Sequence, residues 1–285
     1  KSVPLQAEPA NALIPLETKR AFVQWVNKAY GPGALLSIGN GVSYFVDSPT
    51  GRALLHGSDP LSMLKNWQRL ERYIHSQHTV EFEYFDNCVK VEHNSSTGQE
   101  PTIEEDLAVL GVLCALLYES SATDVAISHS LSASERFFSY PDLSCDSQEL
   151  MRNKQWYIHF NVPEKVSCPI EQAVADTETY NDDVVTRTKK AIIALGFLDV
   201  DLSRVASVLS VSSRSLQRHL GAQHHSFAKL LQDVRVHYAS QLLLNDSSAI
   251  AEVGFVSGFA DQAHFTRVFK QFTGMSPKQY TQFKA

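Results

Sequence analysis

The strongest constraint on the fold is a helical pattern that occurs twice in the last third of the chain. Each copy has a short apolar stripe, a tight turn and a second helix whose apolar residues recur at spacings of three and four. Leu216 and Arg218 of the first copy reappear 49 residues later as Phe265 and Arg267. Two short helices joined by a three- or four-residue turn are typical of a helix-turn-helix unit. The sequence therefore predicts two such units.

The spacing also predicts the bounds of these elements. The first copy has its stripe at 202–209 and its second helix at 213–220, with Ser212 as the N-cap. The second copy has its stripe at 250–256, a turn at 257–259 and a helix at 261–272. Between them we expect a long helix over 226–244, with one buried side made of Phe227, Leu230, Leu231, Val234, Tyr238 and Leu242. Such a helix would hold the two units apart, by about 34 Å if they enter successive major grooves.

The residues that face outward on the second helix of each copy suit a DNA partner. Arginine pairs with guanine O6 and N7, and glutamine pairs with adenine N6 and N7. The first copy offers Arg214, Gln217 and Arg218, and the second offers Gln262, Thr266, Arg267 and Lys270. Alone, Arg214 and Arg218 would read as ordinary solvated arginines. The repeated context is what favours DNA contact.

The second copy closely resembles the signature of the AraC/XylS family of regulators. The residues that carry the likeness are AIAEVGFVSGFADQAHFTRVFK from Ala249 and GMSPKQY, which ends at Tyr280. In the first copy, SSRSLQRHL from Ser212 is similar to the family pattern, so the resemblance covers 185–283. It implies base-facing positions at Arg214, Gln217, Arg218, Gln262, Ala263, Thr266 and Arg267, with Lys270 near phosphate.

Three positions of the second copy call for comment. Ala260 stands where the family favours a serine cap, and we expect Asp261 to compensate through its side chain or the helix dipole. Ala263 cannot donate a hydrogen bond to a base, so specificity there must come from a thymine methyl contact or from elsewhere. His264 suits either a phosphate contact or a structural hydrogen bond. The helical spacing places Phe259, Phe265, Phe269 and Tyr280 in the core.

The rest of the chain has a different pattern. Helices are expected at 17–30, 59–76 and 103–118, and strands at 79–85, 88–93, 122–128 and 156–160. Two apolar stretches, 35–38 and 42–46, flank a turn signal at Gly39-Asn40-Gly41. Glu104, Glu105 and Asp106 read as a solvated first helical turn. Helices interleaved with short strands predict an α+β domain.

The expected organisation is a domain at 1–165, an acidic linker at 166–186 and an all-α DNA-binding domain at 187–285, with two helix-turn-helix units joined by a long helix. Residues 15–165 resemble the effector and dimerisation domain of an ornithine- and arginine-regulator branch of the AraC/XylS family, through Gly33-x-Leu35-x-x-x-x-Gly39, Pro60-Leu61 at the start of a helix to Tyr73, and a strand that reaches Ser128-His129. That likeness implies an effector-sensing, dimerising domain. The aromatic residues there can line an effector pocket or form core, so none is assigned to an effector: Trp25, Trp67, Tyr73, Phe82, Tyr84 and Phe85.

Charge and composition support this division. The chain has a net charge of −6, yet residues 181–285 hold 12 Lys and Arg against 8 Asp and Glu.

The longest apolar run, 107–118, is too short to span a bilayer, and residues 1–20 lack the apolar stretch of a secretory signal. The four cysteines form no C-x-x-C pair and are too sparse for a disulfide scaffold. We therefore expect a cytoplasmic protein with no membrane partner.

The sequence offers little for catalysis. It contains neither a G-x-S-x-G elbow nor a G-x-x-x-x-G-K-[ST] phosphate loop. His75 and His78 can share one face of a helix end, as metal ligands do, but no Cys or carboxylate joins them at a recognisable spacing. A fused DNA-repair alkyl transferase would need an activated, partly exposed cysteine, and the four cysteines show no such grouping. We expect no enzyme activity, cofactor or metal.

These observations predict a bacterial transcription regulator that binds double-stranded promoter DNA. The expected partners are a small-molecule effector bound by residues 1–165, a second copy in a homodimer, and RNA polymerase. The alternative is a DNA-binding regulator that is constitutive or controlled by a protein partner, with no small-molecule ligand.

Overall fold

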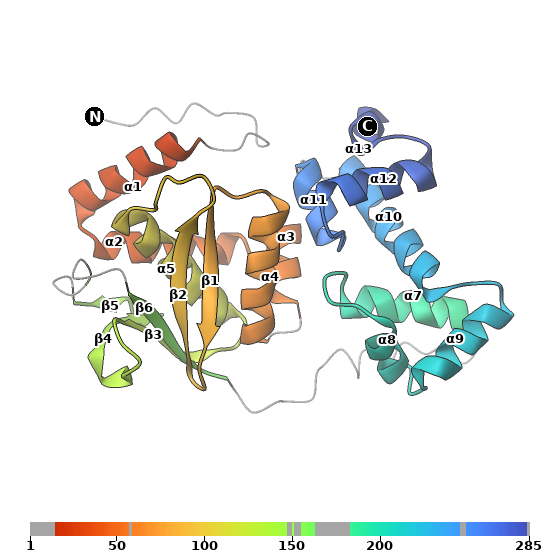
Figure 1. Ribbon diagram of the computed structural model, residues 1–285, viewed down its shortest axis with the longest axis horizontal. Coiled ribbons are helices and arrows are strands. Elements are labelled where there is room, and N and C mark those ends of the chain that lie inside the picture. Colours follow the sequence, from red (N-terminus) through yellow and green to blue (C-terminus); the bar gives the residue numbers. More distant parts are fainter. Residues whose placement is uncertain are drawn as a thin grey trace. The chain divides into compact units, whose positions relative to one another are not determined.

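The structure is a computed structural model, and it describes residues 15–56, 59–146, 150, 155–162, 183–245 and 249–283. These residues fall into two units, one within 15–162 and the other within 183–283 (Figure 1). Of the expected N-terminal domain, residues 1–14 lie outside the described part. The same is true of residues 166–182 of the expected linker, and Asp183 then caps the first helix of the second unit.

A six-stranded antiparallel sheet organises the N-terminal unit, in the order β1-β2-β6-β3-β4-β5. Its strands are β1 His78–Tyr84, β2 Cys88–Ser95, β3 Thr123–Ser128, β4 Arg136–Tyr140, β5 Ser144–Cys145 and β6 Trp156–Asn161. The four strands expected from the sequence are confirmed within one or two residues at each end. Strands β4 and β5 were not predicted, and they extend the sheet beyond β3.

The unit also contains the helices α1 Leu16–Tyr30, α2 Gly33–Leu36, the 3-10 helix η1 Ser37–Tyr44, α3 Pro49–Leu55, α4 Pro60–Tyr73 and α5 Ile103–Glu119, of which α4 and α5 pack against the sheet. Helix α5 packs against β3 and β4 of the sheet and against α1, α2, η1 and α4. Its first turn closes with a capping box, in which Thr102 and Glu105 each accept the other's backbone N–H. The three expected helices of this unit are confirmed, as α1, α4 and α5.

The expected turn at Gly39-Asn40-Gly41 is wrong, because residues 33–44 are helical. The cause is the close crossing of η1 and α2 over α5. A Cβ atom at Gly39 would overlap the carbonyl oxygen of Gly111 in α5, and a Cβ atom at Gly111 would overlap the carbonyl oxygen of Leu36. Packing against α5 therefore overrides the local turn signal.

The histidine pair considered for a metal does not share a helix face. Helix α4 ends at Tyr73, His75 has a φ of 51°, and His78 belongs to strand β1. The Nε2 atom of His78 lies 2.7 Å from the carbonyl oxygen of Gln99. Within the described residues, no group of three or more His, Cys, Asp or Glu could hold a metal ion.

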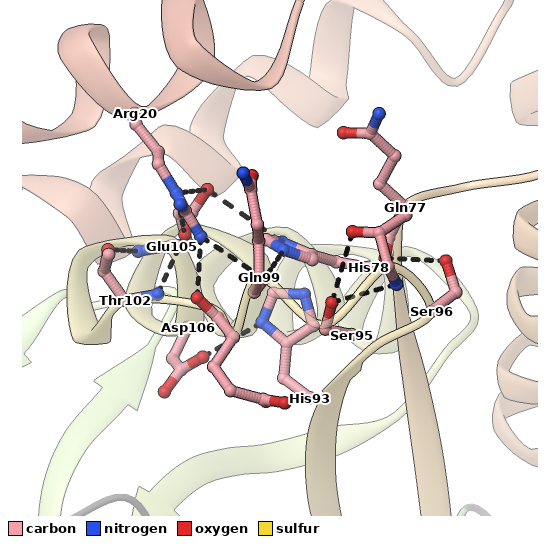
Figure 2. A network of polar contacts seen from close by, with 12 residues as sticks. Arg20, Gln77, His78, His93, Ser95, Ser96, Gln99, Thr102, Glu105 and Asp106 are labelled. Carbon is pink, nitrogen blue, oxygen red and sulfur yellow. Dashed lines mark hydrogen bonds and ion pairs between the residues drawn. The ribbon is translucent and has the colours of Figure 1, made fainter.

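Figure 2 shows the polar network that anchors the N-terminal end of α5. The Arg20 Nε atom of α1 lies 3.1 Å from Oε2 of Glu105. The Nδ1 atom of His93 on β2 lies 3.0 Å from Oδ1 of Asp106, whose Oδ2 accepts a hydrogen bond from Trp156 Nε1 at 3.3 Å. Both carboxylates are buried. The expectation that this first turn is solvated is therefore wrong for Glu105 and Asp106, since they bind α1, β2 and β6 to α5.

Glu71 of α4 is a further buried carboxyl, and its pKa links stability to pH. Its two oxygens accept hydrogen bonds from Trp67 Nε1 and from the Val80 backbone N–H, each at 2.8 Å. Burial raises the pKa of Glu71 from 4.5 to about 7, although these hydrogen bonds and His93 oppose the shift. Because the pKa is higher in the folded state, the stability that Glu71 contributes is complete below pH 4.5 and is lost as the pH rises through about 7.

We expect Glu71→Gln to remove a pH-dependent component of the unfolding free energy. The ionisation of Glu71 should lower the unfolding free energy of the wild type by about 3 kcal/mol between acidic and mildly basic pH. Urea titrations followed by tryptophan fluorescence measure this unit alone, because all three tryptophans lie in it. Glu81→Gln, at an exposed glutamate on β1, is the control. Equal pH slopes for the wild type and Glu71→Gln would contradict the prediction.

Every element described in the second unit is helical: α7 Val184–Leu195, α8 Leu202–Val208, α9 Ser213–Ala222, α10 Phe227–Asn245, α11 Ile250–Val256, α12 Gln262–Thr273, α13 Pro277–Tyr280 and the 3-10 helix η3 Thr281–Phe283. In Figure 1 the long α10 runs between α7–α9 and α11–α13. No helix in the described part of the chain has the length and apolar character that crossing a membrane requires.

Helix α10 has two buried sides rather than the single one expected. Leu230 and Val234 belong to an apolar cluster with α7, α8 and α9, against which Phe227, Leu231 and Tyr238 pack half-buried. A second stripe, Val236, Ala239 and Leu243, is also buried but lies outside that cluster. Because α10 also contacts α11, α12 and α13, it is shared by the cores on both sides.

Candidate nucleic-acid interface

Helix α9 is amphipathic and capped as predicted. The Ser212 hydroxyl oxygen accepts a hydrogen bond from the Ser215 backbone N–H at 3.1 Å. Leu216 and Leu220 are completely buried in the cluster with α7, α8 and α10. The opposite side exposes Arg214, Gln217 and Arg218. The apolar side thus fixes the helix, and the polar side stays open to a partner.

Helix α12 has a comparable arrangement, and Asp261 supplies its cap. Its Oδ1 atom accepts a hydrogen bond from the His264 backbone N–H at 2.7 Å, so the expected compensation for Ala260 is confirmed. The His264 ring is half-buried and lies edge-on to Phe259, 5.6 Å between ring centres. The choice between a phosphate contact and a structural hydrogen bond for His264 stays a prediction.

The outward side of α12 carries the other expected contact residues. Gln262, Ala263, Arg267 and Lys270 are exposed, whereas Thr266 is half-buried. The expected core is confirmed for Phe259, Phe265 and Phe269, which are completely buried. Tyr280 is half-buried, with its ring edge-on to Phe269 at 5.2 Å. That the eight outward residues of α9 and α12 contact DNA stays a prediction.

Both candidate helices lie in stretches free of negative side chains. Residues 213–229 and 262–283 contain no Asp or Glu. Beside the expected residues, the exposed His219, His224, His225 and Lys229 lie at the end of α9 and the start of α10. The charge pattern of the sequence could have suggested these four residues, which are not among the contact positions expected from the helical repeat. Helices in sequence stretches that lack carboxylates favour a polyanionic partner.

The N-terminal unit does not gather its aromatic residues into one pocket. Tyr73 is buried, whereas Trp25, Tyr84 and Phe85 are exposed. An open hollow of about 720 Å³ lies instead at the β4–β5 edge, lined by Arg136, Phe137, Phe138, Ser139, Ser144, Cys145 and Asp146. None of the six aromatic residues considered for an effector lines this hollow.

Two of the three cysteines that the structure describes do not suit an alkyl transferase, and the third, Cys145, is half-buried at the β4–β5 edge. Cys88 and Cys114 are buried, and burial raises the pKa of both thiols. A reactive cysteine needs the opposite shift and solvent access, because the thiolate is the nucleophile. Cys168 lies outside the described residues.

Known proteins are similar to the C-terminal region of this chain. Residues 205–282 match a family model described as a helix-turn-helix domain. The ornithine utilization regulator of Pseudomonas aeruginosa is 31% identical over 109 residues, which are 38% of this chain and 32% of that protein. The HTH-type transcriptional regulator AdiY of Escherichia coli is 34% identical over 82 residues, 29% of this chain and 32% of AdiY. The virulence regulon transcriptional activator VirF of Shigella flexneri is 32% identical over 79 residues, which are 28% of this chain and 30% of VirF.

Two solved structures are also similar. A DNA-binding transcriptional dual regulator from Escherichia coli is 26% identical, with 37% of this chain and 96% of that chain covered and a TM-score of 0.35. The transcriptional regulator CdpR from Pseudomonas aeruginosa is 17% identical, with 95% of this chain and 93% of CdpR covered and a TM-score of 0.36.

The chain spans about a third of the length of the curated relatives it matches. The matched part includes α9 and α12, whose exposed polar sides are described above. The resemblance noted in the sequence is therefore confirmed. Residues 205–282 form an AraC-type helix-turn-helix domain, and over this region the chain is similar to DNA-binding transcription regulators of the AraC/XylS family.

Proposed function

We propose that the chain is a sequence-specific regulator that reads promoter DNA through two helix-turn-helix units, α8–α9 and α11–α12, in a domain at residues 187–285. The observation that carries this proposal is the outward side of α9 and α12. Each helix is capped and packed by buried apolar residues, and each presents exposed Arg and Gln in a stretch without acidic residues. Two such helices on neighbouring turns of the duplex would read two short sub-sites.

The two helices would contribute unequally to base recognition. Helix α9 offers the exposed donors of Arg214, Gln217 and Arg218. On α12, Gln262 and Arg267 are exposed, but Ala263 has no polar group and Thr266 is half-buried. Arginine can make bidentate bonds to guanine, which are the commonest specific contacts with a base. Helix α9 would therefore read its sub-site more strictly, whereas Lys270 would contact phosphate.

The regulation that we propose lies in the domain at 1–165, joined by the linker at 166–186. A small-molecule effector would bind one conformation of this domain more tightly and shift the equilibrium between conformations. Self-association as a homodimer is supported by the aromatic side of α1, where Phe22 is 50%, Trp25 40% and Tyr30 70% exposed. We place the protein in the cytoplasm, with RNA polymerase as a further partner at the promoter.

The alternative is control by a protein partner, or no control at all. A thermal-shift screen of the full chain against metabolites separates the two ideas. An effector present at 100 times its Kd would stabilise the folded state by about 2.7 kcal/mol.

The DNA-reading proposal is tested on duplexes selected by the full chain from a random library. On the selected duplex, Arg218→Ala should weaken binding by about 1–3 kcal/mol and relax specificity at one base pair, because a bidentate pair with guanine is lost. Lys270→Ala should lower affinity on all duplexes alike and reduce the slope of log affinity against log salt by about one. Fluorescence anisotropy titrations at several salt concentrations measure both.

The control is Arg72→Ala, which removes an exposed arginine from the N-terminal unit and should change neither quantity. Failure to enrich any duplex, or unchanged affinity and specificity in Arg218→Ala, would reject the proposal.

A further inference from the structure

One backbone carbonyl links the connection before α8 to the middle of α10. Phe197 follows α7, and its carbonyl oxygen accepts a hydrogen bond from Arg235 Nη2 at 2.7 Å. The ring of Phe197 also packs on Tyr238 of α10, with ring centres 4.7 Å apart. Phe197 belongs to the buried cluster of α7, α8 and α9. Phe197 therefore connects that cluster to two residues in the middle of α10.

The same carbonyl meets the turn between α11 and α12. Gly258 in this turn is buried and has a φ of 79°. A Cβ atom at Gly258 would overlap the Phe197 carbonyl oxygen and would lie 2.9 Å from Arg235 Nε. Phe197, Arg235 and Gly258 thus form one three-way contact, which we call the carbonyl junction. It joins the turn before α12 to the core that supports α9.

The apolar stripes of α10 do not by themselves fix the register of the two halves. Apolar burial is non-directional, and it tolerates small shifts between packed surfaces. A guanidinium bound to a carbonyl is directional and charge-assisted, and the planar fork has a fixed geometry. Arg235 is therefore the group best suited to set the angle and separation of the two halves.

We propose that Arg235 is a positioning residue that, through the carbonyl junction, holds α12 at a fixed distance and angle from α9 and so sets the spacing between the two DNA sub-sites. The DNA part rests on the proposed function. The positional part concerns the free protein and is tested without DNA.

His219 of α9 and Gln271 of α12 are both exposed, so each can be replaced by a non-natural residue that carries a spin label. Pulsed electron paramagnetic resonance then gives the distribution of distances between the two labels. The wild-type chain should give one narrow peak. Arg235→Met, which keeps the side-chain length without the fork, should broaden it, and Arg235→Lys, with a single charged donor, should broaden it less. Lys189→Met breaks a different contact of α10, the 2.8 Å ion pair between Lys189 of α7 and Asp233, and should leave the peak unchanged.

Circular dichroism shows whether each variant is folded. If Arg235→Met does not fold, the width of the Arg235→Lys distance distribution tests the proposal. A peak of wild-type width in the folded Arg235 variants would overturn the inference.

On duplexes selected by the wild type, inserting one or two base pairs between the sub-sites should weaken wild-type binding about tenfold, a loss within the range of a mismatched contact. Arg235→Met should bind the parent duplex more weakly but lose little more on insertion. Equal insertion profiles would overturn the inference. A library that yields no duplex rejects the proposed function, whereas the distance distributions still decide the position of α12.

Discussion

Gly258→Ala should destabilise the C-terminal unit by more than about 3 kcal/mol, as overpacking against backbone and left-handed strain act together. Gly258 has a φ of 79°, where an L-residue is strained. Its new Cβ atom would also overlap the Phe197 carbonyl oxygen, which Arg235 binds and so holds in place. Because the obstacle is backbone, no side-chain rotation relieves it.

Gly274→Ala is the matched control, since Gly274 also has a φ of 79° but has open space where the Cβ atom would go. It should lose only the left-handed strain, about 1–2 kcal/mol. Hydrogen exchange of peptides from α11 and α12, followed by mass spectrometry, measures the opening free energy in each variant. Equal losses in the two variants would show that the carbonyl junction contributes nothing.

Gly39→Ala should destabilise the N-terminal unit by more than about 3 kcal/mol, because the crossing of η1 over α5 leaves no room for a side chain. The Cβ atom would overlap the Gly111 carbonyl oxygen, and both backbones belong to helical segments that cannot yield separately. Gly111→Ala should act in the same direction. The alanine would favour the helix by about 1 kcal/mol through its higher helix propensity. The energetic cost of the overlap with the Leu36 carbonyl oxygen should be larger than this gain.

Gly41→Ala provides the control in the same element, because nothing lies within 4 Å of the place that its Cβ atom would take. Its unfolding midpoint in urea, followed by tryptophan fluorescence, should stay close to that of the wild type. Comparable shifts for Gly39→Ala and Gly41→Ala would mean that η1 does not cross α5 in contact.

The sequence predicts those elements whose own pattern determines them. Helix α5 has a long apolar run and a capping box, and β1 and β2 flank the short connection at Asp86-Asn87. Helices α9 and α12 have caps and apolar spacing, so their outward sides could be named in advance. In each case the information lies within one local stretch of chain.

The features that were missed depend on contacts between distant segments. Residues 33–44 carry a turn signal but fold as helix because they cross α5 at Gly111. Glu105 and Asp106 look solvated until α1, β2 and β6 supply their partners. The second buried stripe of α10 and the carbonyl junction likewise require the second half of the unit to be in place.

The most direct test of the central claim is a hydroxyl-radical footprint of the full chain on a selected duplex. Two helices that read neighbouring turns should protect two short windows on one face of the DNA, about 10 base pairs apart from centre to centre. Arg218→Ala and Arg267→Ala should each weaken one window more than the other. A single window, or two windows that both variants weaken equally, would contradict the claim that α9 and α12 each read a sub-site.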